Sequence, residues 1–179
     1  MIRNKKRAAL EKNEEGAKRT AVSLLAYREH TEKELYTKLT ERGFSKQDAA
    51  AAVAFAVEKK YLSERRYYLR FAEFCAKSKH FGKRRIAQEA KRKGFSSETV
   101  AFYTDEALAD VNFDEICYEA LVGLRHTDKE KQTAALLRRG FTVGNMRYAF
   151  EKQGKEAELS EEMESASFLD TDCDFDDCT

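Results

Sequence analysis

The sequence predicts an all-α protein built from three tandem three-helix repeats in a curved, elongated array. Composition is the first observation: 36% of the 179 residues are charged, eight are glycine, none is proline or tryptophan, and apolar residues recur at helical rather than alternating spacing. The second is a heptad that occurs three times, as LTERGFS (39–45), AKRKGFS (90–96) and LLRRGFT (136–142). Because its glycines are 51 and 46 residues apart, an internal repeat is favoured over three unrelated helix ends.

Each heptad predicts the end of one helix and the start of the next. Its glycine takes the C′ position in the left-handed conformation, its phenylalanine packs back on an apolar residue of the last turn, and its hydroxyl caps the following helix. In the first copy the residues after the glycine are Phe44 and Ser45, and the apolar residue is Leu39. The middle copy has only Ala90 there, so we expect its cap to be the weakest. Basic residues precede every glycine, where positive charge suits the negative end of the helix dipole. The three structural glycines are Gly43, Gly94 and Gly140.

The helices that end at these glycines also have recognisable starts. Thr31 with Glu34, and Thr127 with Glu130, have the spacing of capping boxes, in which the threonine oxygen accepts from an amide and the glutamate reaches back to the cap. In the middle unit, Gly82 lies at the corresponding position and can act as the N-cap. Each unit therefore has a second helix with a defined start and a defined end.

The other six helices are predicted from amphipathic periodicity. Helix 46–60 places Ala49, Ala50, Val53 and Val57 on one face, and helix 64–78 places Tyr67, Phe71, Phe74 and Cys75 on one face, which leaves Tyr68 as the aromatic residue expected at the surface. The remaining four are 17–29, 97–108, 113–124 and 143–151, which gives repeat units at about 17–61, 62–110 and 111–153.

The net charge of +1 conceals a strong polarity along the chain. Residues 1–103 have 25 Lys and Arg against 13 Asp and Glu, whereas residues 104–179 have 8 against 19. Residues 154–179 alone have one lysine against ten carboxylates, so we predict a disordered acidic tail there. Residues 1–16 are predicted to form a charged, flexible leader.

The four cysteines do not suggest a disulfide framework. Cys75 and Cys117 fall on apolar helix faces and are predicted to be small core residues. Cys173 and Cys178 lie in the acidic tail, where a pair of thiols without a second Cys or His pair is a weak zinc signal. We therefore expect no metal and no cofactor.

No catalytic motif is found in the sequence. The three histidines, at 30, 80 and 126, form no metal-spaced pair, and phosphate loops and nucleophile elbows are absent from the sequence. No apolar run is long enough for a membrane span or a signal peptide. These features predict a cytoplasmic protein that is not an enzyme.

One segment has an unusual density of positive charge. Residues 77–93 contain eight Lys and Arg against a single Glu89, and they follow the aromatic-rich ERRYYLRFAEF. Such a segment is either a solvated helix face or a surface for a polyanion such as nucleic acid or an acidic protein groove. The candidate binding residues are Arg65, Arg66, Arg70, Lys77, Lys79, Lys83, Arg84, Arg85, Lys91 and Arg92.

Over about residues 20–151 the chain resembles the RecX family. The resemblance lies in LLAYREHTEKELYTKLTERGF, in YLSERRYYLRFAEF with GKRRIAQEAKRKGF, and in KEKQTAALLRRGF, in that order. Two positions depart from the family pattern, since Ser63 replaces an acidic residue and Lys83 replaces a proline. The acidic tail is outside the family pattern, and the third unit matches it only moderately.

The resemblance implies tandem three-helix repeats and a regulatory role in DNA repair, recombination and the SOS response. A RecX-like protein binds RecA, chiefly as a filament on single-stranded DNA, and modulates its ATPase, strand exchange and coprotease roles, usually by inhibition. It implies a monomer that binds single-stranded DNA weakly if at all, with no membrane partner. The alternative from another functional class is a free-standing nucleic-acid-binding protein whose helix pairs act as helix-turn-helix readers.

Overall fold

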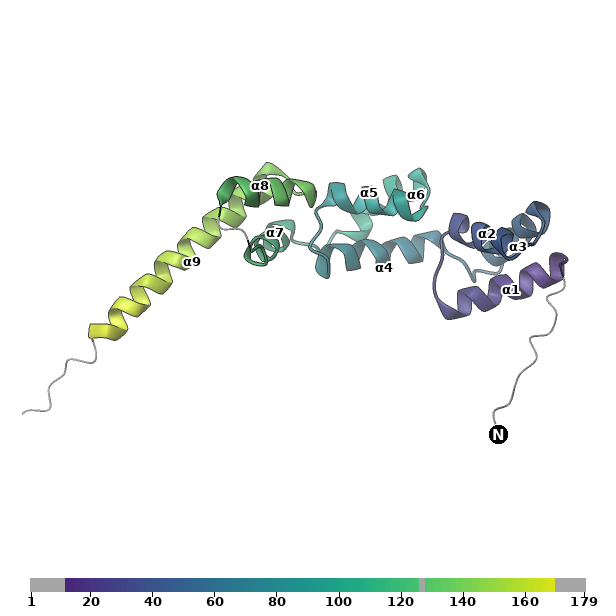
Figure 1. Ribbon diagram of the computed structural model, residues 1–179, viewed down its shortest axis with the longest axis horizontal. Coiled ribbons are helices and arrows are strands. Elements are labelled where there is room, and N and C mark those ends of the chain that lie inside the picture. Colours follow the sequence, from purple (N-terminus) through teal and green to yellow (C-terminus); the bar gives the residue numbers. More distant parts are fainter. Residues whose placement is uncertain (1–11, 126–127, 170–179) are drawn as a thin grey trace, which may run out of the picture. The chain divides into compact units, whose positions relative to one another are not determined.

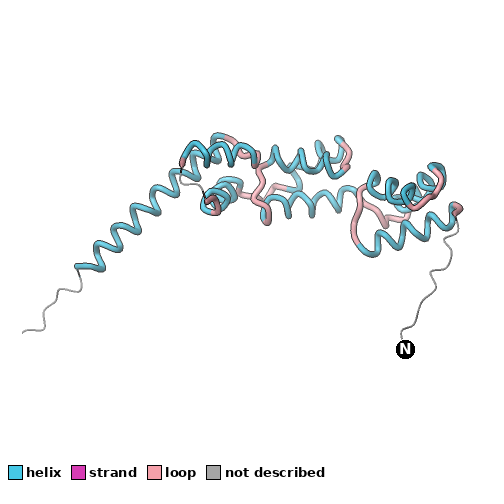
Figure 2. Tube along the Cα trace, viewed as in Figure 1, coloured by secondary structure: helices cyan, strands magenta, loops and turns pink. Residues whose placement is uncertain are grey.

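The computed structural model describes residues 12–125 and 128–169, and within them the chain forms only helices and connecting loops (Figure 2). The all-α prediction is confirmed, and the helices follow the predicted order of three consecutive triplets. The helices of the described ranges, labelled in Figure 1, are α1 (Glu14–Tyr27), α2 (Glu32–Glu41), α3 (Lys46–Glu58), α4 (Glu64–Lys77), α5 (Lys83–Lys93), α6 (Ser97–Ala107), α7 (Phe113–Val122), α8 (Lys129–Arg138) and α9 (Val143–Leu169).

The chain divides into two compact units. The first spans Met1–Cys75 and Ile86–Val111, and the second spans Ala76–Arg85 and Asn112–Thr179. The division therefore falls inside the middle triplet, because the segment Ala76–Arg85, which joins α4 to α5, packs against the turn after α8. This segment contains several candidate basic residues, which consequently belong to the second unit.

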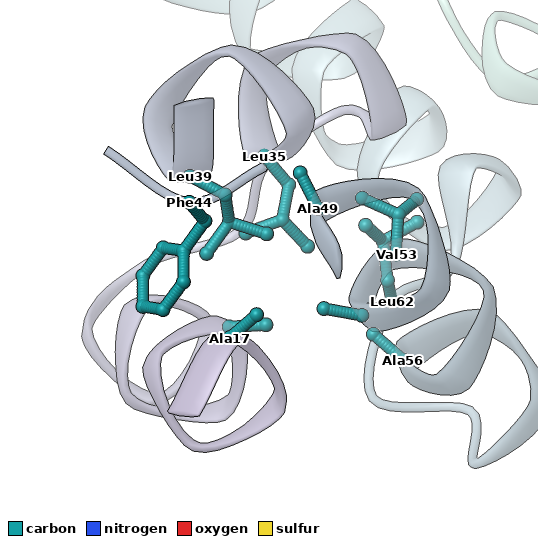
Figure 3. Packing of buried hydrophobic residues seen from close by; sticks show 10 residues of the cluster. Ala17, Leu35, Leu39, Phe44, Ala49, Val53, Ala56 and Leu62 are labelled. Atoms are coloured by element: carbon teal, nitrogen blue, oxygen red, sulfur yellow. The ribbon is translucent and has the colours of Figure 1, made fainter. Parts of the chain in front are cut away.

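The core of the first triplet lies where α1, α2 and α3 meet, and Figure 3 shows its packing. Leu35 and Leu39 of α2 are fully buried, and α3 presents small inward side chains such as Ala49, which let the helices pack closely. Two residues predicted on this inward face are instead exposed, namely Ala50 and Val57. Because α3 has apolar residues on every side, its periodicity did not define the inward face.

All three repeated glycines end their helices in the left-handed conformation, with φ of +85° at Gly43, +98° at Gly94 and +86° at Gly140. In each case the amide of the next phenylalanine donates to a carbonyl in the last helical turn, at 3.2, 3.1 and 3.3 Å respectively, which is a Schellman arrangement. In the middle copy Phe95 packs against the rings of Tyr67 and Tyr68, at centroid distances of 5.0 and 5.3 Å. These contacts with α4 take the place of the leucine that the middle heptad lacks.

The helix starts agree with the prediction at one capping box and differ at the other. The Thr31 hydroxyl accepts from the Glu34 amide at 3.1 Å, and the Glu34 carboxylate accepts from the Thr31 amide at 3.2 Å. Thr127 lies outside the described residues, and α8 begins with Asp128 as its N-cap, whose carboxylate accepts from the Glu130 amide at 2.9 Å. Aspartate is at least as good an N-cap as threonine, so the cap lies one residue later than predicted.

Two predictions for the aromatic residues of α4 are wrong. Tyr68, expected at the surface, is completely buried, and its hydroxyl lies 2.7 Å from the Thr104 hydroxyl on α6. Phe74, expected in the core, is 52% exposed. A buried tyrosine normally finds a partner for its hydroxyl, and the partner here lies 36 residues away in sequence.

The last helix is longer than predicted. We predicted its end at residue 151, whereas α9 runs to Leu169. Contacts with α7 support it, since Lys152 pairs with Glu115 at 2.6 Å and the Tyr118 hydroxyl donates to Glu156. The residues that follow are mainly good helix formers such as glutamate and alanine. The tail expected to be disordered therefore overlaps this helix over residues 154–169.

Other predictions concern the chain ends and the cysteines. α1 begins at Glu14, inside the predicted leader, and residues 1–11 and 170–179 lie outside the described ranges, with Cys173 and Cys178 among them. Cys75 and Cys117 are buried and form no disulfide bond within the described residues. Burial raises the pKa of the Cys117 thiol to about 12, so this thiol stays protonated and unreactive near neutral pH.

Two of the repeated glycine turns, those after α5 and α8, also contact the preceding triplet. In the first unit, a Cβ on Gly94 would lie 3.2 Å from the Thr31 hydroxyl oxygen, so the turn after α5 packs against the start of α2. In the second unit, the Gly82 amide donates to the Arg139 carbonyl at 2.8 Å, so the turn after α8 packs against the start of α5. Both units thus contain the same junction. In it, the end of the second helix of one triplet packs against the start of the second helix of the preceding triplet.

The buried side chain of His30, immediately before the first capping box, leads us to predict that the stability of the protein depends on pH. It is 2% exposed, its Nδ1 lies 2.8 Å from the Arg28 carbonyl, and its Nε2 is buried without a hydrogen-bond partner. Burial lowers its pKa below the usual value of about 6.5, so the unfolded chain takes up the proton first as the pH falls. The stabilisation from neutral His30 is therefore complete above pH 6.5 and is lost as the pH falls from there through the folded-state pKa.

Urea unfolding at pH 7.5 and pH 5.5 measures this effect. The His30→Gln variant, which does not titrate in this range, serves as the control. We expect the unfolding free energy of the wild-type protein to fall more between the two pH values than that of the variant, and equal falls would contradict the assignment.

Candidate functional site

Three candidate arginines lie on α4, and all of them are paired. Arg65 forms a bidentate ion pair with Glu106 of α6. Arg66 donates to one oxygen of Glu29 at 2.9 Å, and Arg70 donates to the other oxygen at 3.5 Å. Since a single carboxylate neutralises only one charge, the group of Arg66, Arg70 and Glu29 retains a positive charge.

Two adjoining grooves of the first unit form what we call the α3 trough. The first groove, of about 630 Å³, lies between α2 and α3, and its apolar lining residues are Tyr36, Ala50, Val53, Ala54 and Val57. The second, of about 690 Å³, lies against the start of α4, and its lining includes Lys60, Leu62, Arg65, Arg66, Leu69 and Arg70. Glu32 and Val57 line both grooves, so the trough is continuous.

Charge is unevenly distributed along the α3 trough. At the α4 end, Lys60 is exposed and forms no ion pair with any described residue, and it adds to the positive charge of Arg66 and Arg70. Along the edge between α2 and α3 the lining includes Glu32, Glu58 and Lys33, and Glu58 pairs with Lys59 at 3.1 Å. Burial, together with the charge of Glu64, raises the pKa of the Glu32 carboxyl. The trough thus has an apolar floor, one edge with charges of both signs and one basic end.

The basic residues around the start of α5, up to Arg85, lie in the second unit. Lys79 and Arg85 lie over the ring of Phe81, at 6.0 and 5.6 Å from its centroid. Lys83 lies over the ring of Phe113 at 5.7 Å. These cation–π contacts place the aliphatic stems on apolar surface. Lys79 and Lys83 are exposed, whereas the Nε of Arg85 is buried.

The structure adds two arginines that were not among the candidates. Arg138 and Arg139 end α8, and the hydrogen bond from Gly82 to the Arg139 carbonyl joins their segment to the start of α5. No ion pair with a described residue is formed by Arg138, Arg139 or the neighbouring candidate Arg84. We call this group the second-unit basic surface; its residues are Lys79, Lys83, Arg84, Arg85, Arg138 and Arg139.

The other candidates are Lys77, Lys91 and Arg92. Lys77 is the last residue of α4, and Lys91 and Arg92 are exposed in the last turn of α5. Arg92 pairs with Glu89 at 3.1 Å. Lys93, which was not a candidate, lies 3.4 Å from Glu34, the glutamate of the first capping box.

The described residues contain neither a metal cluster nor a membrane span. No group of three His, Cys, Asp or Glu side chains among them could hold a metal ion. No helix in the described ranges is both long enough and apolar enough to cross a bilayer. The candidate binding surfaces in this part of the chain are the α3 trough and the second-unit basic surface.

Comparison with known sequences shows which proteins this chain is similar to. The family model described as "RecX, first three-helix domain" matches residues 17–55. The regulatory protein RecX of Vibrio vulnificus (strain CMCP6) is 32% identical over 144 residues, a match that covers 74% of this chain and 89% of the relative. The regulatory protein RecX of Vibrio campbellii (strain ATCC BAA-1116) is 31% identical over 145 residues, and the match covers 74% of this chain and 88% of that relative.

Comparison with solved structures supports the fold. The crystal structure of RecX from Lactobacillus salivarius superposes with a TM-score of 0.66 at 15% identity, covering 78% of this chain and 95% of that one. A second crystal structure, of a regulatory protein RecX, gives a TM-score of 0.63 at 16% identity, covering 77% of this chain and 73% of that one. At such low identity these likenesses establish the helical-repeat architecture alone.

Proposed function

Because the chain belongs to the RecX family of regulatory proteins, we propose that it binds the RecA recombinase, mainly as the filament on single-stranded DNA, and lowers its ATPase and recombinase activity. In this proposal the protein acts as a cytoplasmic monomer without catalysis of its own. It needs no cofactor, since the nucleotide and magnesium belong to RecA.

The observation that carries the proposal is the extent of the similarity. The match to the Vibrio vulnificus relative covers 89% of that protein, so it involves all three triplets and not a single helix-turn-helix unit. The charged surfaces are compatible with a partner that combines protein and nucleic acid. The second-unit basic surface suits phosphates, and the α3 trough suits a protein segment.

A titration of RecA's DNA-dependent ATPase tests the proposal. With RecA and single-stranded DNA held constant, we expect the rate of ATP hydrolysis to fall at amounts of this protein well below one per RecA molecule. The control is a helicase whose ATPase depends on the same DNA, which should be unaffected because it offers no RecA surface. An unchanged RecA rate at equimolar protein would overturn the proposal.

The alternative, a free-standing nucleic-acid-binding protein, is favoured by Arg84, Arg138 and Arg139, which form no ion pair within the described residues. Such a protein would bind DNA without RecA and would prefer particular sequences. The helicase control separates the two functions, since a DNA binder would lower both ATPase rates by competing for DNA.

A further inference from the structure

α3 has no polar side along most of its length. From Ala49 to Val57 every residue is apolar. One side of this stretch forms the core of the first triplet, whereas Ala50, Ala54 and Val57 face solvent in the α3 trough. A helix that is apolar all round is normally buried on all sides, so the outward side of α3 has the character of a contact surface.

The outward residues have the spacing of a helix-packing surface. Ala50, Ala54 and Val57 follow each other at intervals of four and three residues, which spans about 10 Å at 1.5 Å per residue. Two alanines in this row allow the axis of a neighbouring helix to approach to about 8 Å, the short end of the usual range. Tyr36 of α2 and Leu69 of α4 line the trough on either side of this row.

We propose that the α3 trough is the docking site for an amphipathic α-helix of the protein partner, with the apolar stripe of that helix on α3 and carboxylates at one of its ends on Lys60, Arg66 and Arg70. This inference rests on the proposed function, because it takes that partner to be RecA in its filament.

Charge complementarity defines the partner helix. The α4 end of the trough holds Lys60, which is unpaired among the described residues, and two arginines that share the single carboxylate of Glu29. Carboxylates of the partner at this end would form ion pairs with these three cations. The edge between α2 and α3 has no such excess of positive charge, because Glu32 and Glu58 lie beside Lys33 there and Glu58 pairs with Lys59. Carboxylates are therefore attracted mainly to the α4 end. The apolar floor, with Glu32 lining both grooves, does not suit a phosphodiester backbone.

Binding of the labelled protein to RecA filaments tests the inference. Ala54→Arg places a long charged side chain on the apolar floor, and Arg70→Glu reverses a charge at the basic end. We expect each variant to weaken binding at least tenfold. The matched control is Ala101→Arg, on an exposed alanine of α6 outside the trough, which should bind like the wild-type protein and confirm that an added arginine is tolerated.

The outcomes separate the two proposals. Wild-type affinity for both trough variants, with normal binding of the wild-type protein, would overturn the docking site and leave the proposed function intact. Failure of the wild-type protein to bind RecA would overturn the proposed function and with it this identification of the partner. Circular dichroism melts of all variants show whether a loss of binding arises from unfolding.

Cross-linking identifies the occupant directly. A benzophenone on Ala54→Cys, in a chain whose Cys173 and Cys178 are replaced by serine, should react with a helical RecA segment that has apolar residues at helical spacing and carboxylates at one end. Cross-links to DNA, or to an extended RecA segment, would contradict the inference.

Discussion

Replacing Gly140 by alanine is expected to destabilise the protein by about 3 kcal/mol or more, which exceeds the effect of a left-handed alanine alone. A Cβ at this position would lie 2.8 Å from the Arg85 Cβ and closer still to the Arg85 backbone nitrogen, neither of which can move without displacing α5. The strain of a left-handed alanine costs about 1 to 2 kcal/mol, and overpacking against backbone costs about 1 to 3 kcal/mol more.

Gly43 and Gly154 provide the matched comparison. A Cβ on Gly43 would meet only the flexible end of Lys12, so Gly43→Ala should cost about 1 kcal/mol, from the left-handed backbone alone. Apart from its chain neighbours and the backbone of its own helix, a Cβ on Gly154 in α9 would meet no described atom within 4 Å, so alanine there should be neutral or stabilising. Urea unfolding of the three variants measures these differences, and equal losses at Gly43 and Gly140 would show that the packing against α5 does not contribute.

The second large effect is expected in the binding of single-stranded DNA. Arg84→Ala with Arg138→Ala removes two cations that form no ion pair within the described part of the chain. Each lost phosphate contact lowers the salt slope by about 0.7 for a single strand, so the double variant should bind several-fold more weakly at low salt, with a slope reduced by about 1.4.

The matched control removes two paired arginines. Arg65→Ala with Arg92→Ala changes the charge by the same amount, but Glu106 and Glu89 already compensate these side chains. Fluorescence anisotropy with a labelled oligonucleotide over a range of salt concentrations measures both variants. If the two double variants have the same salt slope, the second-unit basic surface is not a specific contact region for phosphate.

Local sequence signals predicted the helices well. The repeated Gly-Phe pair determines the Schellman turns because glycine alone adopts their left-handed φ without strain, and Thr31 forms its capping box because all the atoms required lie within four residues. The end of α9 was missed for the opposite reason. Its continuation depends on contacts with α7 such as that between Lys152 and Glu115, which lie 37 residues apart.

The candidate site was predicted less well, because charge and exposure depend on contacts distant in sequence. Clustered positive charge identified Arg66 and Arg70, but their shared partner Glu29 lies on the loop before α2. Arg138 was interpreted only as a residue suited to a helix end, since nothing local shows that Gly82 packs beside it. The α3 trough had one available signal, the absence of any polar residue between Ala49 and Val57, which we interpreted as core.

The junction found in both units has a consequence for how such a chain can change in length. The end of one triplet's second helix packs on the start of the preceding triplet's second helix, at Gly94 with Thr31 and at Gly140 with Gly82. A tandem duplication of one triplet would therefore reproduce both halves of the contact at once, without any newly evolved interface. Gene duplication and deletion can thus add or remove whole triplets, whereas an insertion within a triplet would disrupt the spacing on which each junction depends.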